Sequence, residues 1–139
     1  MKVLTKELEF KTKGNNDIIN ITENVLSVVE KSGINEGTVT LFVVGSTAAL
    51  STCEYEPALV SDIKEIFEKL IPKNVSYAHD DTWGDANGYA HLRATLLGPS
   101  LIVPFVKGRM SLGTWQQIIL IDFDNRPRQR KVMATLQGV

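Results

Sequence analysis

The first residues of the chain alternate between a mostly apolar and a mostly polar face: Leu4, Lys6, Leu8 and Phe10 alternate with Val3, Thr5, Glu7 and Glu9. A period of two residues predicts a half-buried strand. Gly14–Asn16 has the composition of a turn, so we expect Ile18–Ile19 to begin a second strand that pairs with the first. The β-branched and apolar segment Thr38–Val44 predicts a central strand.

Two segments repeat their apolar residues at helical spacing instead. The first begins with Asn20 and Glu23, which resemble a capping box, and ends at Gly33; its apolar face consists of Ile21, Val25, Val28 and Val29. The second begins at Pro57, which suits a first helical turn, and its face consists of Leu59, Ile63, Phe67 and Leu70. Both patterns predict amphipathic helices.

The remainder of the chain predicts a polar loop, a short helix and three further strands. The loop is Asp80–Gly88, and the helix is Ala90–Leu97. The strands are Leu101–Val106, Trp115–Phe123 and Arg130–Leu136. Because strands outnumber helices and follow one another at the end, the pattern indicates an α+β fold with mainly antiparallel sheet.

Composition limits the class of protein without pointing to its chemistry. With 139 residues, 43% of them apolar, we expect one domain covering residues 1–139. A net charge of -1 gives no electrostatic reason to expect nucleic acid or an anionic membrane as partner. Cys53 is the only cysteine, which excludes an internal disulfide and a cysteine-rich zinc site. No secretory signal or membrane-length apolar run is visible, so we expect a soluble, cytoplasmic protein.

The two histidines mark the strongest candidate site. His91 follows Asp85 and Asn87 at six and four residues, so Asn87 and His91 share one face if this segment is helical. His79 precedes two aspartates. Each histidine is either a hydrogen-bonded structural residue or part of a site, and the neighbouring amide and carboxylate favour a site for His91. Two imidazoles and a carboxylate also suit a divalent metal, although the spacing matches no compact ligand motif.

Three other segments carry candidate chemistry. Trp115 offers a flat surface for a heteroaromatic ring beside Gln116, or else covers a sheet edge. Gly45-Ser46-Thr47 ends a predicted strand, where backbone N–H groups and hydroxyls either hold a phosphate or form an ordinary turn. Glu54 and Glu56 would point to one side of an extended segment. The basic residues between Arg126 and Lys131 are expected to form a solvated turn, with anion binding toward a neighbouring subunit as the alternative.

Several separated motifs resemble one family, and the resemblance runs over essentially the whole chain. The most specific are the Asn-x-x-x-His-Leu piece at Asn87–Leu92 and Leu-Gly-Thr-Trp-Gln at Leu112–Gln116. Further matching segments are Gly45–Ala49, Glu54–Pro57, Tyr77–Asp80, Leu97–Ser100, Pro104, Gly108 and Arg126–Arg128. Together they are similar to the YjbQ-like family.

The resemblance implies a two-sheet β-sandwich with two main helices, assembled as a homotrimer. It also implies a weak thiamine-phosphate synthase activity, which joins a hydroxymethylpyrimidine diphosphate to a thiazole phosphate and releases pyrophosphate. Many relatives have a histidine where this chain has Gly45. A site of three imidazoles therefore cannot form here, and His79 and His91 would need Glu54 or an aspartate to complete a Mg or Zn shell.

Two functions from different classes follow. As a transferase, the chain would use His91, oriented by Asn87 or Asp85, as proton donor or acceptor, with His79 and Glu54 in the same catalytic set. Substrate phosphates and rings would contact Ser46, Thr47, Arg93, Arg109, Trp115 and Gln116. As a binding protein, the trimer would hold a small phosphorylated metabolite or a metal without turnover, since no nucleophile–base pair is visible.

Overall fold

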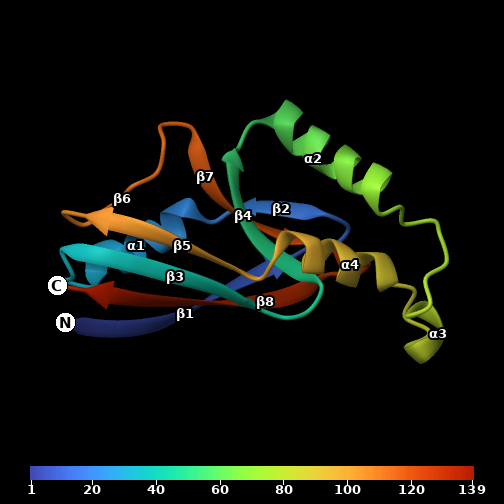
Figure 1. Cartoon of the computed structure of the whole chain (residues 1–139), viewed down its shortest axis with the longest axis horizontal. Coiled ribbons are helices and arrows are strands. Elements are labelled where there is room, and N and C mark those ends of the chain that lie inside the picture. The colour runs from blue at the N-terminus through green and yellow to red at the C-terminus, as the bar shows by residue number, and fades with distance from the viewer.

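The computed structural model describes residues 1–139, and a five-stranded antiparallel sheet forms its larger layer. In spatial order its strands are β1 (Lys2–Thr12), β8 (Arg128–Gly138), β3 (Glu36–Val44), β5 (Ser100–Val106) and β6 (Arg109–Met110). Both chain ends lie at the same end of this sheet, because Lys2 on β1 pairs with Gly138 on β8 (Figure 1). Alternate residues of β3 and β8 are buried, as the period-two pattern requires.

A three-stranded antiparallel sheet packs against the first, in the order β2 (Asp17–Asn20), β7 (Gln116–Asp122) and β4 (Ala48–Glu54). The central strand β7 is apolar on both faces. Ile118 and Leu120 pack into the core between the sheets, while Ile119 and Ile121 pack into a second core beneath the helices. Because one strand serves two cores, its sequence is a continuous apolar run rather than an alternating one.

Helix α1 (Thr22–Lys31) closes the core between the sheets with Ile21, Val25 and Val29. The predicted capping box is present only in half. Asn20 Oδ1 accepts from the Thr22 N–H at 3.1 Å and from the Thr22 hydroxyl, but no bond from Glu23 completes it.

Helices α2 (Pro57–Leu70) and α4 (Gly88–Leu97) cover the outer face of the smaller sheet, joined by the short helix α3 (Asp80–Trp83) (Figure 1). Glu56 caps α2 by accepting from the Ala58 and Leu59 N–H groups. Of the predicted apolar face, Phe67 is buried but Leu70 is 61% exposed, since α2 meets the sheet along part of its length only.

The α+β class with antiparallel sheets is confirmed. Two local predictions are wrong. Ile18 and Ile19 pair with β7 rather than with β1. In this position Ile18 packs into the core beneath the helices, and Ile19 packs against the core between the sheets. Asp80–Gly88 is not all loop, since Asp80 begins the single turn of α3. No helix of this fold is long and apolar enough to cross a membrane.

Candidate functional site

A polar cavity of about 320 Å³ lies where β3 turns into β4, beside α3, the start of α4 and the turn between β7 and β8. Six of the predicted site residues line it: Ser46, Thr47, His79, Asp85, Asn87 and His91. The other lining residues are Gly45, Trp83, Asp124, Arg128 and Arg130. Segments 45–47, 79–91 and 124–130 therefore meet at one place.

Strand pairing brings these segments together. Ala48, the first residue of β4, is opposite Asp122, the last residue of β7. The Phe123 N–H donates to the Thr47 carbonyl at 2.9 Å and continues this pairing into the turn. Consequently the Gly45–Thr47 turn lies over the connection that leads from Asp122 to Arg128.

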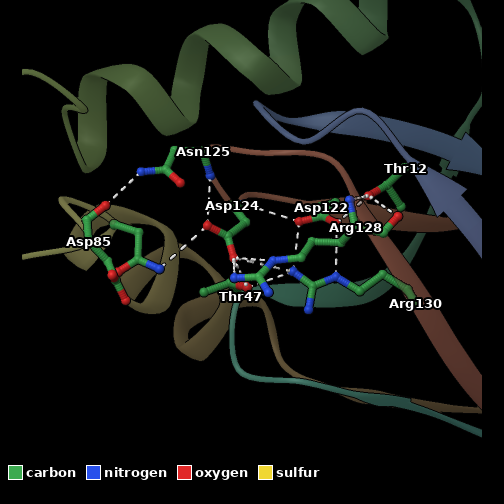
Figure 2. Close-up of polar contacts among 9 residues, drawn as sticks. Thr12, Thr47, Asp85, Asp122, Asp124, Asn125, Arg128 and Arg130 are labelled. Atoms are coloured by element: carbon green, nitrogen blue, oxygen red, sulfur yellow. Dashed lines mark hydrogen bonds and ion pairs between the residues drawn. The ribbon is translucent and has the colours of Figure 1, made fainter. Parts of the chain in front are cut away.

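Asp122 is buried beneath the cavity and holds Arg130 in an ion pair made of two hydrogen bonds. Arg130 Nε donates to Asp122 Oδ2 and Nη2 donates to Oδ1, both at 2.8 Å, and the Thr12 hydroxyl also donates to this carboxylate (Figure 2). Arg130 is 7% exposed and Asp122 is fully buried. Because two parallel bonds fix the guanidinium plane, the direction of its remaining nitrogen is fixed as well.

Asp124 is the second buried carboxylate and collects donors from three segments. It accepts from the Thr47 hydroxyl at 2.9 Å, Arg128 Nε at 3.0 Å, the Asn125 N–H at 2.8 Å and Asn87 Nδ2 at 3.4 Å (Figure 2). Burial alone would raise the pKa of the Asp124 carboxyl, but these hydrogen bonds together hold it below its ordinary value. The carboxylate is therefore ionised and saturated with donors.

Both arginines leave a terminal nitrogen without a protein acceptor. Arg130 uses Nε and Nη2, and its Nη1 lies against Gly45, where an added Cβ would be 2.7 Å away. Arg128 contacts Asp124 through Nε and Nη2 only. Gly45 has φ +148°, a conformation that favours glycine. The missing side chain thus leaves the Arg130 Nη1 group open to the cavity.

The two histidines lie side by side, with ring centroids 4.5 Å apart and planes inclined by 62°. Burial lowers the pKa of the His91 imidazole, and His79 lowers it further, while Asp124 and Asp85 partly oppose this. His91 is therefore neutral at pH 7. The predicted helical spacing is present, since the His91 N–H donates to the Asn87 carbonyl. The Asn87 amide, however, donates to Asp124 rather than to His91, and its buried Oδ1 has no partner.

These residues do not form a zinc site made of protein side chains alone. No three His, Cys, Asp or Glu side chains gather into a ligand group. Zinc sites use three or four such ligands; His79, His91, Asp85 and Asp124 line the cavity but do not gather into one group. At Gly45, where the family resemblance implies a third histidine, a Cβ would be 2.7 Å from Arg130 Nη1, so a side chain there would meet the guanidinium group.

The remaining predicted site residues lie elsewhere in this chain. Glu54 is opposite Gln116 at the far end of the β4–β7 pair, six residues from the Ala48–Asp122 pair, or about 20 Å along the strands. Arg109 is exposed on β6, and Trp115 is 71% exposed just before β7. Arg93 is a buried residue of α4 that donates to Ile71, Asn16 and Glu68. A role for these residues stays a prediction.

The sequence interpretation missed the arginine–aspartate pairs altogether. It expected the basic segment near the C-terminus to be solvated, yet Arg130 is buried and the Arg128 side chain is only 34% exposed. One signal in the sequence could have found them. Asp122 and Asp124 are two residues apart, as are Arg128 and Arg130, so two carboxylates and two guanidinium groups on adjoining segments can form ion pairs. Trp83 gave no periodic signal.

Comparison with known proteins agrees with this fold over nearly the full length. The family model described as UPF0047 protein YjbQ-like matches residues 6–139. A UPF0047 protein of Methanothermobacter thermautotrophicus is 41% identical over 99% of this chain and 94% of its own length. One from Archaeoglobus fulgidus is 43% identical over 92% of this chain and 97% of its own length.

Solved structures give the same result in three dimensions. A YbjQ-like protein of unknown function from Sulfolobus solfataricus superimposes with a TM-score of 0.93 at 33% identity and covers 99% of both chains. An uncharacterised conserved protein of the same family from Clostridium acetobutylicum reaches 0.87 at 33% identity, over 95% of this chain and 99% of its own. Sequence and structure together show that the chain belongs to the YjbQ-like UPF0047 family.

Proposed function

We propose that the cavity binds the phosphate or diphosphate group of a small metabolite, and that the chain is a cytoplasmic transferase acting on that group. The observation that carries the proposal is the Arg130 Nη1 group, held in a fixed direction against Gly45 with no protein acceptor. Arg128, Ser46 and the imidazoles add further donors around the same space. Phosphate oxygens are the acceptors that such guanidinium groups match best.

The ion pairs beneath the cavity bear on what kind of anion it takes. Asp122 and Asp124 neutralise the arginines, so the site recognises its ligand by directed hydrogen bonds more than by net charge. The unpartnered Asn87 Oδ1 adds an acceptor, which suits a ligand that has a hydroxyl or amine besides its phosphate. A Mg²⁺ ion accompanying a diphosphate would take Asp85, the lining carboxylate without an arginine partner.

The reaction that fits this site and the family resemblance couples a pyrimidine diphosphate to a thiazole phosphate. The carbon–oxygen bond to the diphosphate breaks, its electron pair leaves with pyrophosphate, and a carbon–nitrogen bond forms to the thiazole. Arg128 and Arg130 would stabilise the charge that develops on the leaving group. His91 would donate a hydrogen bond or proton to it, because a bound anion offsets the burial that keeps this imidazole neutral.

Calorimetry with inorganic phosphate and with pyrophosphate tests the binding half of the proposal. We expect saturable binding by the wild-type chain and binding about tenfold weaker in Arg128→Gln, since one charge-assisted donor is lost. Glu65→Gln on the exposed face of α2 is the matched control and should bind as the wild type does. Absence of saturable binding in the wild type would refute the proposal.

Mass spectrometry of a reaction with both substrates tests turnover. We expect thiamine phosphate and pyrophosphate in equal amounts, and a fall in kcat of about a hundredfold in His91→Ala. Full turnover in that variant would remove His91 from the mechanism. Saturable binding without product would favour the second candidate, a phosphate-binding protein. That candidate is supported by one observation: neither imidazole has a hydrogen-bonded partner to orient it for proton transfer.

We also propose that the chain associates with copies of itself, as the resemblance to a trimeric family implies. The supporting observation is the outer face of the larger sheet, where Phe42, Val44, Ile102 and Val106 are 46–64% exposed. Sedimentation should give about three times the 15.4 kDa of one chain. Ile102→Glu should shift this mass downward, and a monomeric wild type would refute the proposal.

A further inference from the structure

Trp83 is the one apolar contributor to a cavity whose other lining residues are polar or glycine. It is the last residue of α3, and 76% of its surface is exposed. Indole is the largest side chain available for contact with a ligand, and its exposed faces gain free energy when another flat apolar group covers them. An aromatic face beside a group of phosphate donors suggests a second point of contact for the same ligand.

Hydrogen bonds on both sides of Trp83 hold the backbone that carries it. The Asp80 carboxylate accepts from the Tyr77 N–H at 3.0 Å and from the Gly88 N–H at 2.9 Å, so it links the two ends of the α3 segment. A side chain at Gly88 would be 2.9 Å from that carboxylate. After α3, the Gly84 N–H donates to the Asp80 carbonyl, and Asn125 Nδ2 donates to the Asp85 carbonyl at 2.8 Å. A backbone segment ordered in advance reduces the entropy lost when a ligand binds.

We propose that Trp83 is a specificity-determining residue that stacks on a planar aromatic or heteroaromatic ring joined to the ligand's phosphate. The inference rests on the proposed function and assigns the residue that contacts the ring of its ligand. Trp115, which the sequence suggested for stacking, is 71% exposed and is not one of the residues of this chain that line the cavity. Ile66, an apolar residue on α2 that is 48% exposed and does not line the cavity, is the control for Trp83.

Three probes separate the phosphate contact from the ring contact: inorganic phosphate, cyclohexyl phosphate and phenyl phosphate. The cyclohexyl ring is apolar and similar in size but not flat. We expect wild-type chain to bind phenyl phosphate about five- to tenfold more tightly than cyclohexyl phosphate by calorimetry. Trp83→Ala should reduce that ratio to about one while its affinity for inorganic phosphate stays within about twofold. Ile66→Ala should keep the wild-type ratio.

Fluorescence gives an independent readout because the chain has two tryptophans. In Trp115→Phe the emission comes from Trp83 alone, and phenyl phosphate should change it with the same Kd that calorimetry gives. Equal wild-type affinities for the two ring probes, with inorganic phosphate still bound, would overturn the stacking inference and leave the phosphate site intact. If inorganic phosphate itself fails to bind, the proposed function fails first.

Discussion

Two buried arginines of this chain have opposite surroundings. Arg93 is 1% exposed and uses all three guanidinium nitrogens, with acceptors on Ile71, Asn16 and Glu68, while its plane lies over the Tyr89 ring at 4.9 Å. Arg130 is 7% exposed and uses two nitrogens, leaving Nη1 directed at the cavity beside Gly45. Burial is nearly the same for both, but the number of unused donors differs.

The two arginines differ in how many of their guanidinium donors have protein acceptors, not in how deeply they are buried. This difference distinguishes a structural arginine from a candidate binding one. A buried donor without an acceptor is unfavourable, so native structures rarely keep one unless a ligand or water completes it. Arg93 links α4 to the end of α2, and each of its guanidinium nitrogens has a protein acceptor. Arg130 Nη1 has no protein acceptor and is open to the cavity, where water or a ligand accepts from it.

The largest expected effect concerns the carboxylates that serve the two arginines. Asp124→Asn should lower the free energy of unfolding at pH 7 by about 3 kcal/mol, because several donors lose a charged acceptor. Glu68→Gln should lower it by less than about 1 kcal/mol, since Glu68 is half exposed. Urea unfolding of both variants measures the difference. Equal losses would mean that the Asp124 network contributes no more than a surface pair.

Asp124 also predicts that the free energy of unfolding depends on pH. The pKa of Asp124 is lower in the folded chain than in the unfolded one, so the unfolded state binds the proton first as pH falls. Its stabilising contribution is present at neutral pH and is lost below about pH 4 as the folded-state pKa is approached. The stability gap between wild type and Asp124→Asn should therefore narrow between pH 5 and pH 2.5, and a constant gap would contradict the assigned protonation.

Conservative replacement of the arginines gives an intermediate effect. Arg93→Lys and Arg130→Lys should each lower stability by about 2 kcal/mol, because lysine keeps the charge but not the planar set of donors. Phosphate affinity should fall about tenfold in Arg130→Lys and stay unchanged in Arg93→Lys. Calorimetry and urea unfolding of the two variants test both halves. Equal loss of binding in both would show that the fold, not Nη1, supports the ligand.

The smallest effect tests the glycine beside Nη1. Gly45→Ala should weaken phosphate binding about fivefold and lower stability by about 1 kcal/mol, because φ is +148° and the new Cβ would be 2.7 Å from Nη1. Gly33→Ala is the control, with φ +70° and no atom within 4 Å of an added Cβ. It should lower stability by a similar amount and leave binding unchanged. Weaker binding in the control would show that strain alone accounts for the effect.

Local patterns predicted more of the fold than of the site. The alternation in β1, the helical face around Val25 and the central strand β3 needed only neighbours in sequence, and each appears in the structure. The partner of β2 was not predictable in this way, because Ile18 is equally apolar opposite β1 or β7. For the site, the helical spacing of Asn87 and His91 was found, but the partner of the Asn87 amide was not.

The sequence by itself determined the α+β class, the scarcity of histidine that marked His79 and His91, and the motifs of the YjbQ-like family. Only the tertiary structure decided which chemistry surrounds those histidines. Strand pairing places the Gly45–Thr47 turn against the segment from Asp122 to Arg130, far along the chain. The physical reason is that pairing and burial act between distant residues. The segment Arg128–Arg130 has the composition of a solvated turn. Ion pairs with Asp124 and Asp122 instead hold both arginines at the cavity.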